Sequence, residues 1–391
     1  MKKILRMKKV CLVFNDASRY HEAIYQCIDR EYDCEWYFMK PNTDIKVMDI
    51  SKLGNAREVP TIFVPHTPIY YQCHIQRLLW KRDNQLFFML GDLFCLSTWV
   101  FLLLRKVFFP KKKVYLWTHG WYGKETGLRR TLKKWFFQMA DGIFLYCNYA
   151  KKLMLKEGFD ESSLYVIHNS LDYDKQLAIR ENLKPSLLYK NHFGNENHNL
   201  LFLGRLTKNK RLDMIIEALN QLRQKGQEYN LTFVGDGAER ANLEALVSKY
   251  HLEHNVWFYG ACYDEGVNAE LVYNADLCVS PGNVGLTAMH VMMFGCPVLT
   301  HNDYPHQMPE FEAVHSGETG DFFERDNIAS LANKMEDWFR KHEGTREKVR
   351  TDCMKEIDNQ WTPEFQMNVI RKIQEWFARP ANILTPRAIT T

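Results

Sequence analysis

Short apolar segments alternate with amphipathic ones along most of the chain, and this alternation restricts the fold more than any other feature of the sequence. The amphipathic stretches repeat their apolar residues at helical spacing, as at 19–30 and 128–140. The apolar segments have the length of buried strands and lie at 10–15, 35–39, 61–64, 85–90, 114–118, 142–147 and 165–168. Strands that alternate with helices in this way predict a parallel, doubly wound α/β sheet.

A chain of 391 residues is too long for one compact core, and the alternation is interrupted once by a stretch rich in Asn, with Pro and Gly. A second series of strands and helices follows, so we expect two Rossmann-like domains with a cleft between them. The last helix begins at Thr362-Pro363, a good start signal, and we expect it to pack back on the first domain. The expected parts are a first domain at 1–180, a linker at 181–198, a second domain at 199–362, and the final helix and tail at 363–391.

A glycine-bearing turn in the second half is typical of phosphate binding. The apolar run 275–280 ends at Pro281, and a helical pattern runs from about Leu286 to Phe294. A strand, a glycine turn and a helix in this order direct bare backbone N–H groups at a phosphate. We therefore expect contacts to a phosphate from Asn283, Val284, Gly285 and Leu286.

Two cations follow the strand expected at 199–203. Arg205 comes directly after Gly204, and Lys210 stands five residues further on. Arg presents a planar fork and Lys a point charge, so together they are suited to gripping a diphosphate from two sides. A solvated basic loop is the alternative. Gly235 and Gly237 after the next strand are a weaker indication, since tight turns use glycine with or without a ligand.

Polar side chains gather after two other strands. The run 301–312 follows the strand at 298–300 and contains Asp303, Glu310 and Glu312, while His119 follows the strand at 114–118. Ligands of α/β sheets lie beyond the carboxyl ends of strands, so these residues are further candidates for a binding site. The alternatives are an ordinary solvated loop and a structural histidine. We see no clustering of metal-ligand residues in the sequence, and we expect neither a metal nor another cofactor.

Composition excludes several classes of protein. The net charge of +4 is too small to indicate a nucleic-acid binder, and the ten cysteines contain no Cys-x-x-Cys pair, as expected for reduced thiols in the cytosol. The apolar run after the basic N-terminus is too short for a secretory signal. The apolar stretch 86–104 is better explained by a buried strand and a helix than by a membrane span, because it contains Asp92. We expect a cytoplasmic protein.

The segment from Arg105 to Lys134 is strongly basic, with ten Lys and Arg residues against Glu125, and it interleaves these cations with Phe and Trp. Such faces dock on anionic membrane surfaces with the rings at the level of the headgroups. A solvated helix face over core aromatics explains the pattern equally well.

The fragments of the second half occur in an order and spacing that resemble one family, the family 4 retaining glycosyltransferases of the glycosyl transferases group 1 type. The resemblance covers about residues 199–340. Its fragments are Gly204-Arg205-x₄-Lys210, Val234-Gly235-Asp236-Gly237, Val256-x-Phe258-x-Gly260, Tyr273-x-Ala275-Asp276, Gly285-Leu286, Gly295-x-Pro297-Val298 and Glu312-x₄-Gly317-x-Thr319-Gly320. Trp117-Thr118-His119-Gly120 and His168-Asn169-Ser170-Leu171-Asp172 extend it loosely into the first half.

This resemblance implies the GT-B fold and a sugar transfer from a nucleotide-diphosphate sugar to a glycan or lipid-linked glycan acceptor, as in bacterial surface-polysaccharide synthesis. It implies that Arg205 and Lys210 stabilise the leaving diphosphate and that His119 contacts a sugar. It further implies a donor site formed by Gly204, Gly235, Gly237, Asn283, Val284, Gly285, Leu286, His290, Asp303, Glu310 and Glu312.

The chain departs from the family at two positions. By resemblance, Gly282 and His290 stand where the family has a glutamate that touches the donor sugar and one that touches the ribose. Three explanations remain open: His290 with Asn283 or the 301–303 segment takes over these contacts, the donor is unusual, or the protein is inactive. We expect the first, hence an active enzyme. The rival from another class is an inactive subunit that positions a partner glycosyltransferase at the membrane; a nucleotide-sugar epimerase or a phosphorylase would share the fold.

Overall fold

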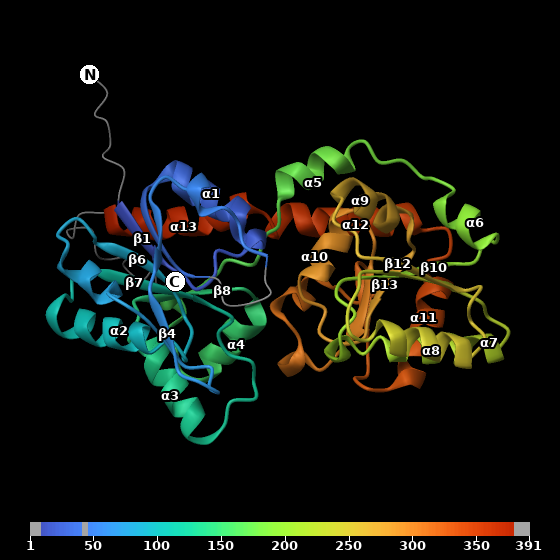
Figure 1. Cartoon of the computed structure of the whole chain (residues 1–391), viewed down its shortest axis with the longest axis horizontal. Helices are drawn as coiled ribbons and strands as arrows, with labels where there is room; N and C mark the ends of the chain where they lie inside the picture. Colours follow the sequence, from blue (N-terminus) through green and yellow to red (C-terminus); the bar gives the residue numbers. More distant parts are fainter. Residues whose placement is uncertain (1–8, 41–45, 379–391) are drawn as a thin grey trace, which may run out of the picture.

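The computed structural model describes residues 9–40 and 46–378 and consists of two α/β domains side by side (Figure 1). Each domain is built on a parallel sheet with helices on both faces, as the alternation predicted. The first sheet runs β3 (Ala56–Val59), β2 (Asp33–Met39), β1 (Lys9–Val13), β6 (Leu86–Leu90), β7 (Lys113–Thr118), β8 (Gly142–Leu145) and β9 (Leu164–Val166). The second runs β12 (Val256–Gly260), β11 (Asn230–Val234), β10 (Asn199–Leu203), β13 (Leu277–Ser280), β14 (Val298–His301) and β15 (Gly320–Phe323).

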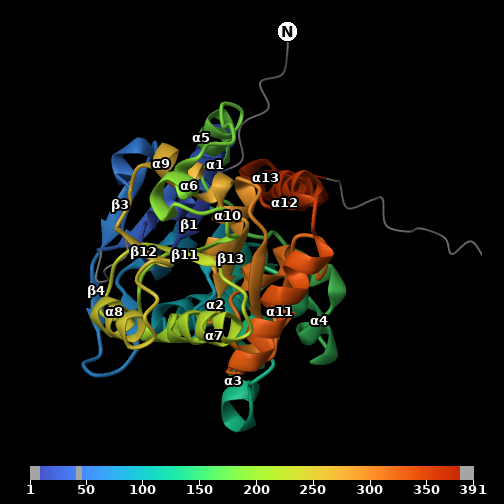
Figure 2. The same ribbon diagram turned by 90° about the vertical axis from the view of Figure 1, so that its right-hand side faces the viewer.

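The helices of the first domain are α1 (Glu22–Glu31), α2 (Leu96–Phe108), α3 (Gly127–Gln138) and α4 (Asn148–Lys156). Two helices follow at the junction, α5 (Tyr173–Arg180) and α6 (Leu188–Phe193), and both pack against the core of the second domain. Those of the second domain are α7 (Asp213–Gln224), α8 (Arg240–Lys249), α9 (Glu265–Asn274), α10 (Leu286–Met293), α11 (Ile328–Lys341) and α12 (Arg346–Gln360). Seen end-on, α7, α8 and α11 cover one face of the second sheet and α9, α10 and α12 the other (Figure 2). The sheet is therefore buried on both sides, which explains why its strands are almost wholly apolar.

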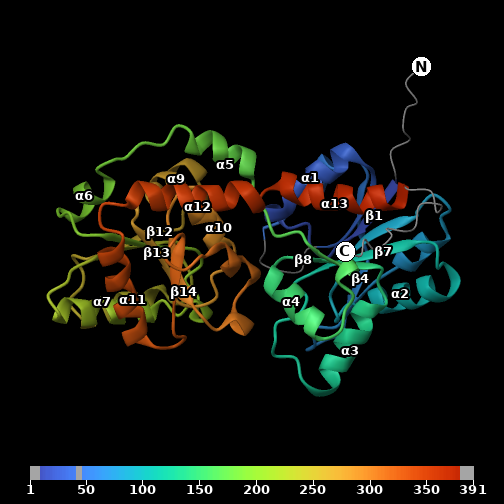
Figure 3. The same cartoon turned by 180° about the vertical axis from the view of Figure 1, so that it is seen from behind.

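The polypeptide crosses between the domains twice. The first crossing follows β9, and the second joins α12 to α13 (Pro363–Ala378), which lies over α1 on the first domain (Figure 3). Ile370 and Ile373 of α13 are buried in the core of that domain, and Arg371 pairs with Glu31 of α1 at 2.7 Å. The chain thus returns to the domain in which it began, and two segments of the polypeptide connect the domains.

Two sequence expectations differ from the structure. The segment 61–64 does not join the parallel sheet: β4 (Thr61–Phe63) pairs antiparallel with β5 (Tyr70–Gln72), and β3 takes the edge instead. Pro60 stands between β3 and β4 and has no N–H for the ladder, which ends the edge strand there. The expected linker 181–198 contains α6, whose buried Tyr189 donates a hydrogen bond from its hydroxyl to the carbonyl of Leu271 at 2.7 Å. That stretch belongs to the second domain.

The apolar stretch 86–104 divides between β6 and the start of α2. Among the described residues, no helix is long and apolar enough to cross a membrane.

Candidate active site between the two domains

The N-terminus of α10 presents unpaired backbone N–H groups. Gly285, with φ of 56°, turns the chain into the helix, a conformation that favours glycine. Within the described chain, no acceptor faces the amides of Gly285, Leu286 and Thr287, whereas the amide of Val284 donates to Gln307 Oε1 at 3.0 Å. Three free donors at the positive end of a helix form a place for an anion.

Lys210 and Arg205 flank this helix end. The Lys210 ammonium donates to the carbonyl oxygen of Asn283 at 2.6 Å and to its Oδ1 at 2.9 Å, which leaves one N–H free. Burial lowers the pKa of Lys210 to about 8, so the side chain is still mostly charged at neutral pH. Arg205 is exposed, and its guanidinium makes no hydrogen bond or ion pair within the part of the chain that the structure describes. The two predicted cations thus reach the same site, one fixed and one free.

The three other predicted glycines serve loop packing. The amides of Gly204, Gly235 and Gly237 donate to Val234 O, Gly260 O and Asp236 Oδ1 respectively. A Cβ on Gly235 would lie 1.9 Å from Gly204 O, and one on Gly237 2.3 Å from Leu206 O. These residues bring the loops after β10 and β11 into direct backbone contact, and their N–H groups are already used.

The backbone of η5 (Lys208–Lys210) explains the glycine at 282. The amide of Gly282 donates to Lys210 O at 2.9 Å, and a Cβ there would meet Asn209 O at 2.1 Å and Lys210 Cα at 2.7 Å. The backbone of the cation-bearing loop therefore occupies the space that a side chain at 282 needs. A carboxylate cannot be accommodated at this position without moving the loop that carries Lys210.

A carboxylate does stand beside His290, but it comes from another helix. Glu265, the first residue of α9, has its Oε1 2.9 Å from His290 Nε2 and accepts from Gln176 Nε2 at 2.7 Å. Burial opposes ionisation of Glu265, but the hydrogen bonds from His290 and Gln176 outweigh it and lower the pKa. Sequence analysis missed Glu265 and Gln176, because nothing in their local sequence distinguishes them from ordinary helix residues.

The predicted acidic residues of the 301–312 segment have separate roles. Asp303 pairs with Arg325 at 2.7 Å and with His306 at 2.8 Å, so its carboxylate is held at the surface of the loop. Glu310 in η7 (Pro309–Ala313) is almost completely buried. Its Oε1 accepts from Asn169 Nδ2 at 3.1 Å, and its Oε2 has no partner among the described residues. Burial raises the pKa of Glu310, an effect that Asn169 and Lys210 partly offset.

Glu312 does not face a donor site as predicted. Its Oε2 accepts from the amide of Asn148 at 2.7 Å and from Asn148 Nδ2 at 3.2 Å, and its Oε1 accepts from the amide of Tyr149. The side chain therefore caps the N-terminus of α4 in the other domain. This is a correction to the prediction: both oxygens are engaged in holding the domains together, a contact that no local pattern in the sequence shows.

A pocket of about 670 Å³ lies in the first domain at the carboxyl ends of β1, β6 and β7. Aromatic rings line much of it, with His119 and His21 among the polar groups. Burial lowers the pKa of His119 to about 4 and that of His21 to about 3, so both are neutral at pH 7. His119 Nδ1 is buried without a partner within the described residues, while both ring nitrogens of His21 lie 3.3 Å from tyrosine hydroxyls. His21 was not predicted.

A smaller cavity of about 290 Å³ joins the two halves. Lys124 of the first domain lines it together with Gly282, Asn283, His301 and Arg325 of the second. It lies on the β14 side of the α10 N-terminus, beside the turn at 281–283. Among the described residues, no group of three or more His, Cys, Asp or Glu side chains is arranged to hold a metal ion.

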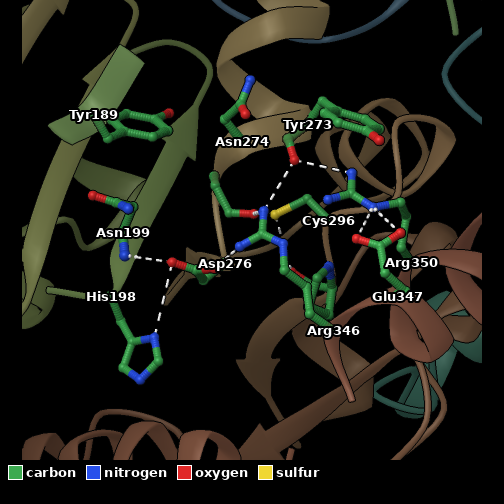
Figure 4. Close-up of polar contacts among 12 residues, drawn as sticks. Tyr189, His198, Asn199, Tyr273, Asn274, Asp276, Cys296, Arg346, Glu347 and Arg350 are labelled. Carbon is green, nitrogen blue, oxygen red and sulfur yellow. Dashed lines mark hydrogen bonds and ion pairs between the residues drawn. The ribbon is translucent and has the colours of Figure 1, made fainter. Parts of the chain in front are cut away.

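A cavity of about 660 Å³ lies at the amino ends of the strands of the second sheet, and two of the arginines near it are engaged in contacts within the domain. Arg346 donates to the carbonyls of Tyr273 and Ala275 and pairs with Asp276, while Arg350 lies 3.6 Å from the centre of the Tyr273 ring (Figure 4). These arginines tie α12 to the amino end of β13. Among the described residues, the unpaired guanidinium of Arg205 and the unpaired amides of α10 lie instead at the carboxyl ends of the strands.

Comparison with known proteins agrees with this geometry. Residues 188–355 match the family model described as "Glycosyl transferases group 1". The chain is 27% identical over 157 residues to the putative glycosyltransferase EpsD of Bacillus subtilis, and 25% identical over 154 residues to the amylovoran biosynthesis glycosyltransferase AmsD of Erwinia amylovora. These matches span 39% and 41% of the relatives' own lengths.

Solved structures extend the likeness to the whole fold. A glycosyltransferase from Rickettsia africae superposes with a TM-score of 0.71 at 15% identity, over 96% of this chain and 100% of that one. Alr3699/HepE of Anabaena, solved in complex with UDP, gives 0.66 at 14% identity, over 95% of this chain and 100% of that one. The expected GT-B fold is confirmed, and the expected glycosyltransferase-type enzyme domain is confirmed for the matched residues. Residues 188–355 thus resemble a glycosyl transferases group 1 domain, and the chain as a whole has the GT-B fold.

Proposed function

We propose that the chain is a retaining glycosyltransferase that moves a sugar from a nucleotide-diphosphate sugar to a glycan or lipid-linked glycan acceptor during cell-surface polysaccharide synthesis. One observation carries the proposal: three unpaired amides at the start of α10 face outward between a fixed Lys210 and a free Arg205. The names of the relatives, among them an amylovoran biosynthesis enzyme, support the choice of polysaccharide synthesis.

The donor's diphosphate would lie against the α10 N-terminus. As the acceptor hydroxyl forms its bond to the anomeric carbon, the bond from that carbon to the diphosphate breaks and negative charge grows on the leaving oxygen. Arg205, Lys210 and the amides of Gly285 and Leu286 stabilise this charge, because they are already oriented before it develops. The leaving phosphate takes the acceptor's proton, so the products are the new glycoside and a nucleoside diphosphate. These groups supply the charge that a metal ion would otherwise provide.

The acceptor would bind in the pocket of the first domain. Its lining combines aromatic rings with several polar and charged side chains, which suits a sugar that presents both a ring face and hydroxyl groups. His119 is neutral, so it would hydrogen-bond a sugar hydroxyl rather than add a charge.

Two neighbouring helices suggest where the acceptor comes from. On α3, Leu128, Leu132 and Trp135 form an exposed apolar stripe, with Trp135 67% exposed. On α2, an exposed stripe of Leu96, Val100, Leu103 and Val107 ends at Phe108. Basic residues such as Arg129 and Lys134 accompany the stripe on α3. We propose that this face docks on an anionic membrane. Flotation with anionic liposomes at low salt tests this, and recovery in the soluble fraction would contradict it.

The test of the main proposal is the release of free nucleotide from candidate nucleotide sugars in the presence of acceptors. Arg205→Ala is the informative variant, because the side chain is exposed and unpaired, so its removal leaves the fold intact. We expect a loss of about 10²-fold in kcat, the usual effect of deleting one charge-stabilising donor. Lys208→Ala is the matched control: this exposed lysine stands in the same loop.

The absence of a side chain at 282 favours one second candidate, an inactive subunit that positions a partner enzyme. Donor binding without turnover across a panel of acceptors would support that candidate and contradict the main proposal.

A further inference from the structure

Glu265 is held by two helices other than its own. His290 of α10 and Gln176 of α5 both lie within hydrogen-bond distance of Oε1, and since an ionised carboxylate can only accept, both side chains donate to it. In the described chain no group bonds to the second oxygen, Oε2. The side chains of Glu265 and His290 remain 22% and 17% exposed. One oxygen is thus fixed, and the other is open to a ligand.

The place of this carboxylate follows from the order of the strands. Glu265 stands at the beginning of α9, just past the carboxyl end of β12, and His290 lies one helical turn beyond Leu286 on the same side of α10. The proposed diphosphate site lies where β10 and β13 meet, the point at which the strand order reverses. Glu265 is therefore on the β12 side of the diphosphate, and the cavity that reaches Lys124 is on the β14 side.

A nucleotide sugar is linear: sugar, diphosphate, ribose, base. If the sugar faces the first domain through the β14-side cavity, the ribose must lie on the β12 side, next to Glu265. A carboxylate that accepts two hydrogen bonds suits a pair of neighbouring hydroxyls. We infer that Glu265, positioned by His290 and Gln176, binds the 2′- and 3′-hydroxyls of the donor's ribose. This inference rests on the proposed function and assigns the nucleoside end of the same site.

The assignment also accounts for the histidine at 290. His290 supplies a donor that fixes Glu265, so the negative group comes from α9 instead of α10. Glu265 is then the residue that touches ligand, and His290 is a positioning residue. The lowered pKa of Glu265 keeps it an acceptor at neutral pH.

Calorimetric titration of the full chain tests the inference with UDP, GDP, CDP and ADP, each beside its 2′,3′-dideoxy counterpart. For the nucleotide that binds best, we expect the wild type to prefer the ribose form by about 10–100-fold, the range for hydrogen bonds to a charged group. Glu265→Gln should bring the two forms to within about threefold by weakening only the ribose form. His290→Ala should reduce the preference partly, and His290→Gln should restore some of it.

The matched control is Glu270→Gln on the same helix, whose carboxylate accepts from Ser186 Oγ at 3.0 Å. It should leave the preference unchanged. A purely structural Glu265 would lower the affinity for both forms alike, so a preference that survives in Glu265→Gln overturns the inference. A wild type that binds both forms equally also overturns it, while leaving the proposed diphosphate site standing. Failure of the wild type to bind any of these nucleotides would overturn the proposed donor site as well.

Discussion

Gly282→Ala is the sharpest test of how the cation-bearing loop and the phosphate-type turn are joined. The added Cβ would lie 2.1 Å from Asn209 O and 2.7 Å from Lys210 Cα, both backbone atoms that no side-chain rotation can move away. The hydrogen bond from the Gly282 amide to Lys210 O, 2.9 Å long, would be strained by the same displacement. One methyl group should therefore shift the Lys210 ammonium relative to the α10 N-terminus.

The magnitude follows from these two effects. Forcing a methyl into a packed site costs about 1–3 kcal/mol, and weakening one backbone hydrogen bond adds about 1 kcal/mol. A loss of about 2–4 kcal/mol should lower the melting temperature of a domain of this size by about 5–15 °C. Nucleoside diphosphate binding should fall as well, since one of the two cations is displaced.

Scanning calorimetry and nucleotide titration measure the two effects. Gly54→Ala is the control, because a Cβ there has only Asp29 Oδ2 nearby, at 3.5 Å. If Gly282→Ala melts within about 1 °C of wild type, the close approach of the loops does not exist in solution. Gly282→Glu should be more damaging still, and a gain of transfer activity in that variant would refute the steric explanation for the missing carboxylate.

Four further predictions concern other residues at the interface between the domains and in the pocket of the first domain. Burial lowers the pKa of Lys210 to about 8, so its charge is lost as the pH rises past that value. Donor affinity should therefore fall above pH 8 in binding titrations from pH 6 to 9.5. Lys210→Met lacks the charge at every pH, so its affinity should depend less on pH. The lowered pKa of Lys210 should also raise the free energy of unfolding of the wild type between pH 8 and 10.5, because the unfolded chain binds more protons than the folded one in that range. An equal rise of the free energy of unfolding with pH in Lys210→Met would contradict this. Glu312→Ala removes the cap on α4 and should lower the free energy of unfolding by about 1 kcal/mol in urea titrations; an equal effect from the exposed Glu318→Ala would speak against the cap. His119→Ala should reduce sugar transfer in the nucleotide-release assay and leave nucleoside diphosphate affinity in place; a drop confined to nucleotide affinity would move His119 out of the acceptor pocket.

Local patterns were sufficient for residues whose function depends on their own backbone. Gly285 and the apolar helix after it predict a turn that exposes amides, and within residues 9–40 and 46–378 the amides of Gly285, Leu286 and Thr287 have no acceptor. Arg205 and Lys210 were predicted in the same way, since residues two and seven positions after the end of β10 must lie near that strand end. The pattern could not show that Lys210 is tied to Asn283 and that Arg205 is not.

Residues whose role depends on a partner far along the chain were misjudged or missed. Glu312 resembles a donor contact in sequence, yet it caps a helix 164 residues away. Glu265 lies 25 residues from His290 and 89 from Gln176, so no spacing rule connects them. His21 lies beside His119 in the pocket of the first domain only because β1 and β7 both lie near the middle of the first sheet.

The sequence by itself determined the class of fold and the position of the phosphate-type turn, because hydrophobic periodicity, glycine and proline act within a few residues. The tertiary structure alone decided which side chains remain free to meet a ligand. In the folded protein, hydrogen bonds to other protein groups occupy the amides of Gly204, Gly235 and Gly237 and the carboxylate of Glu312. The packing of α9 against α10 places Glu265 beside His290. Whether a polar group is available for chemistry depends on hydrogen bonds closed over long sequence separations, and these exist only after the domains have folded together.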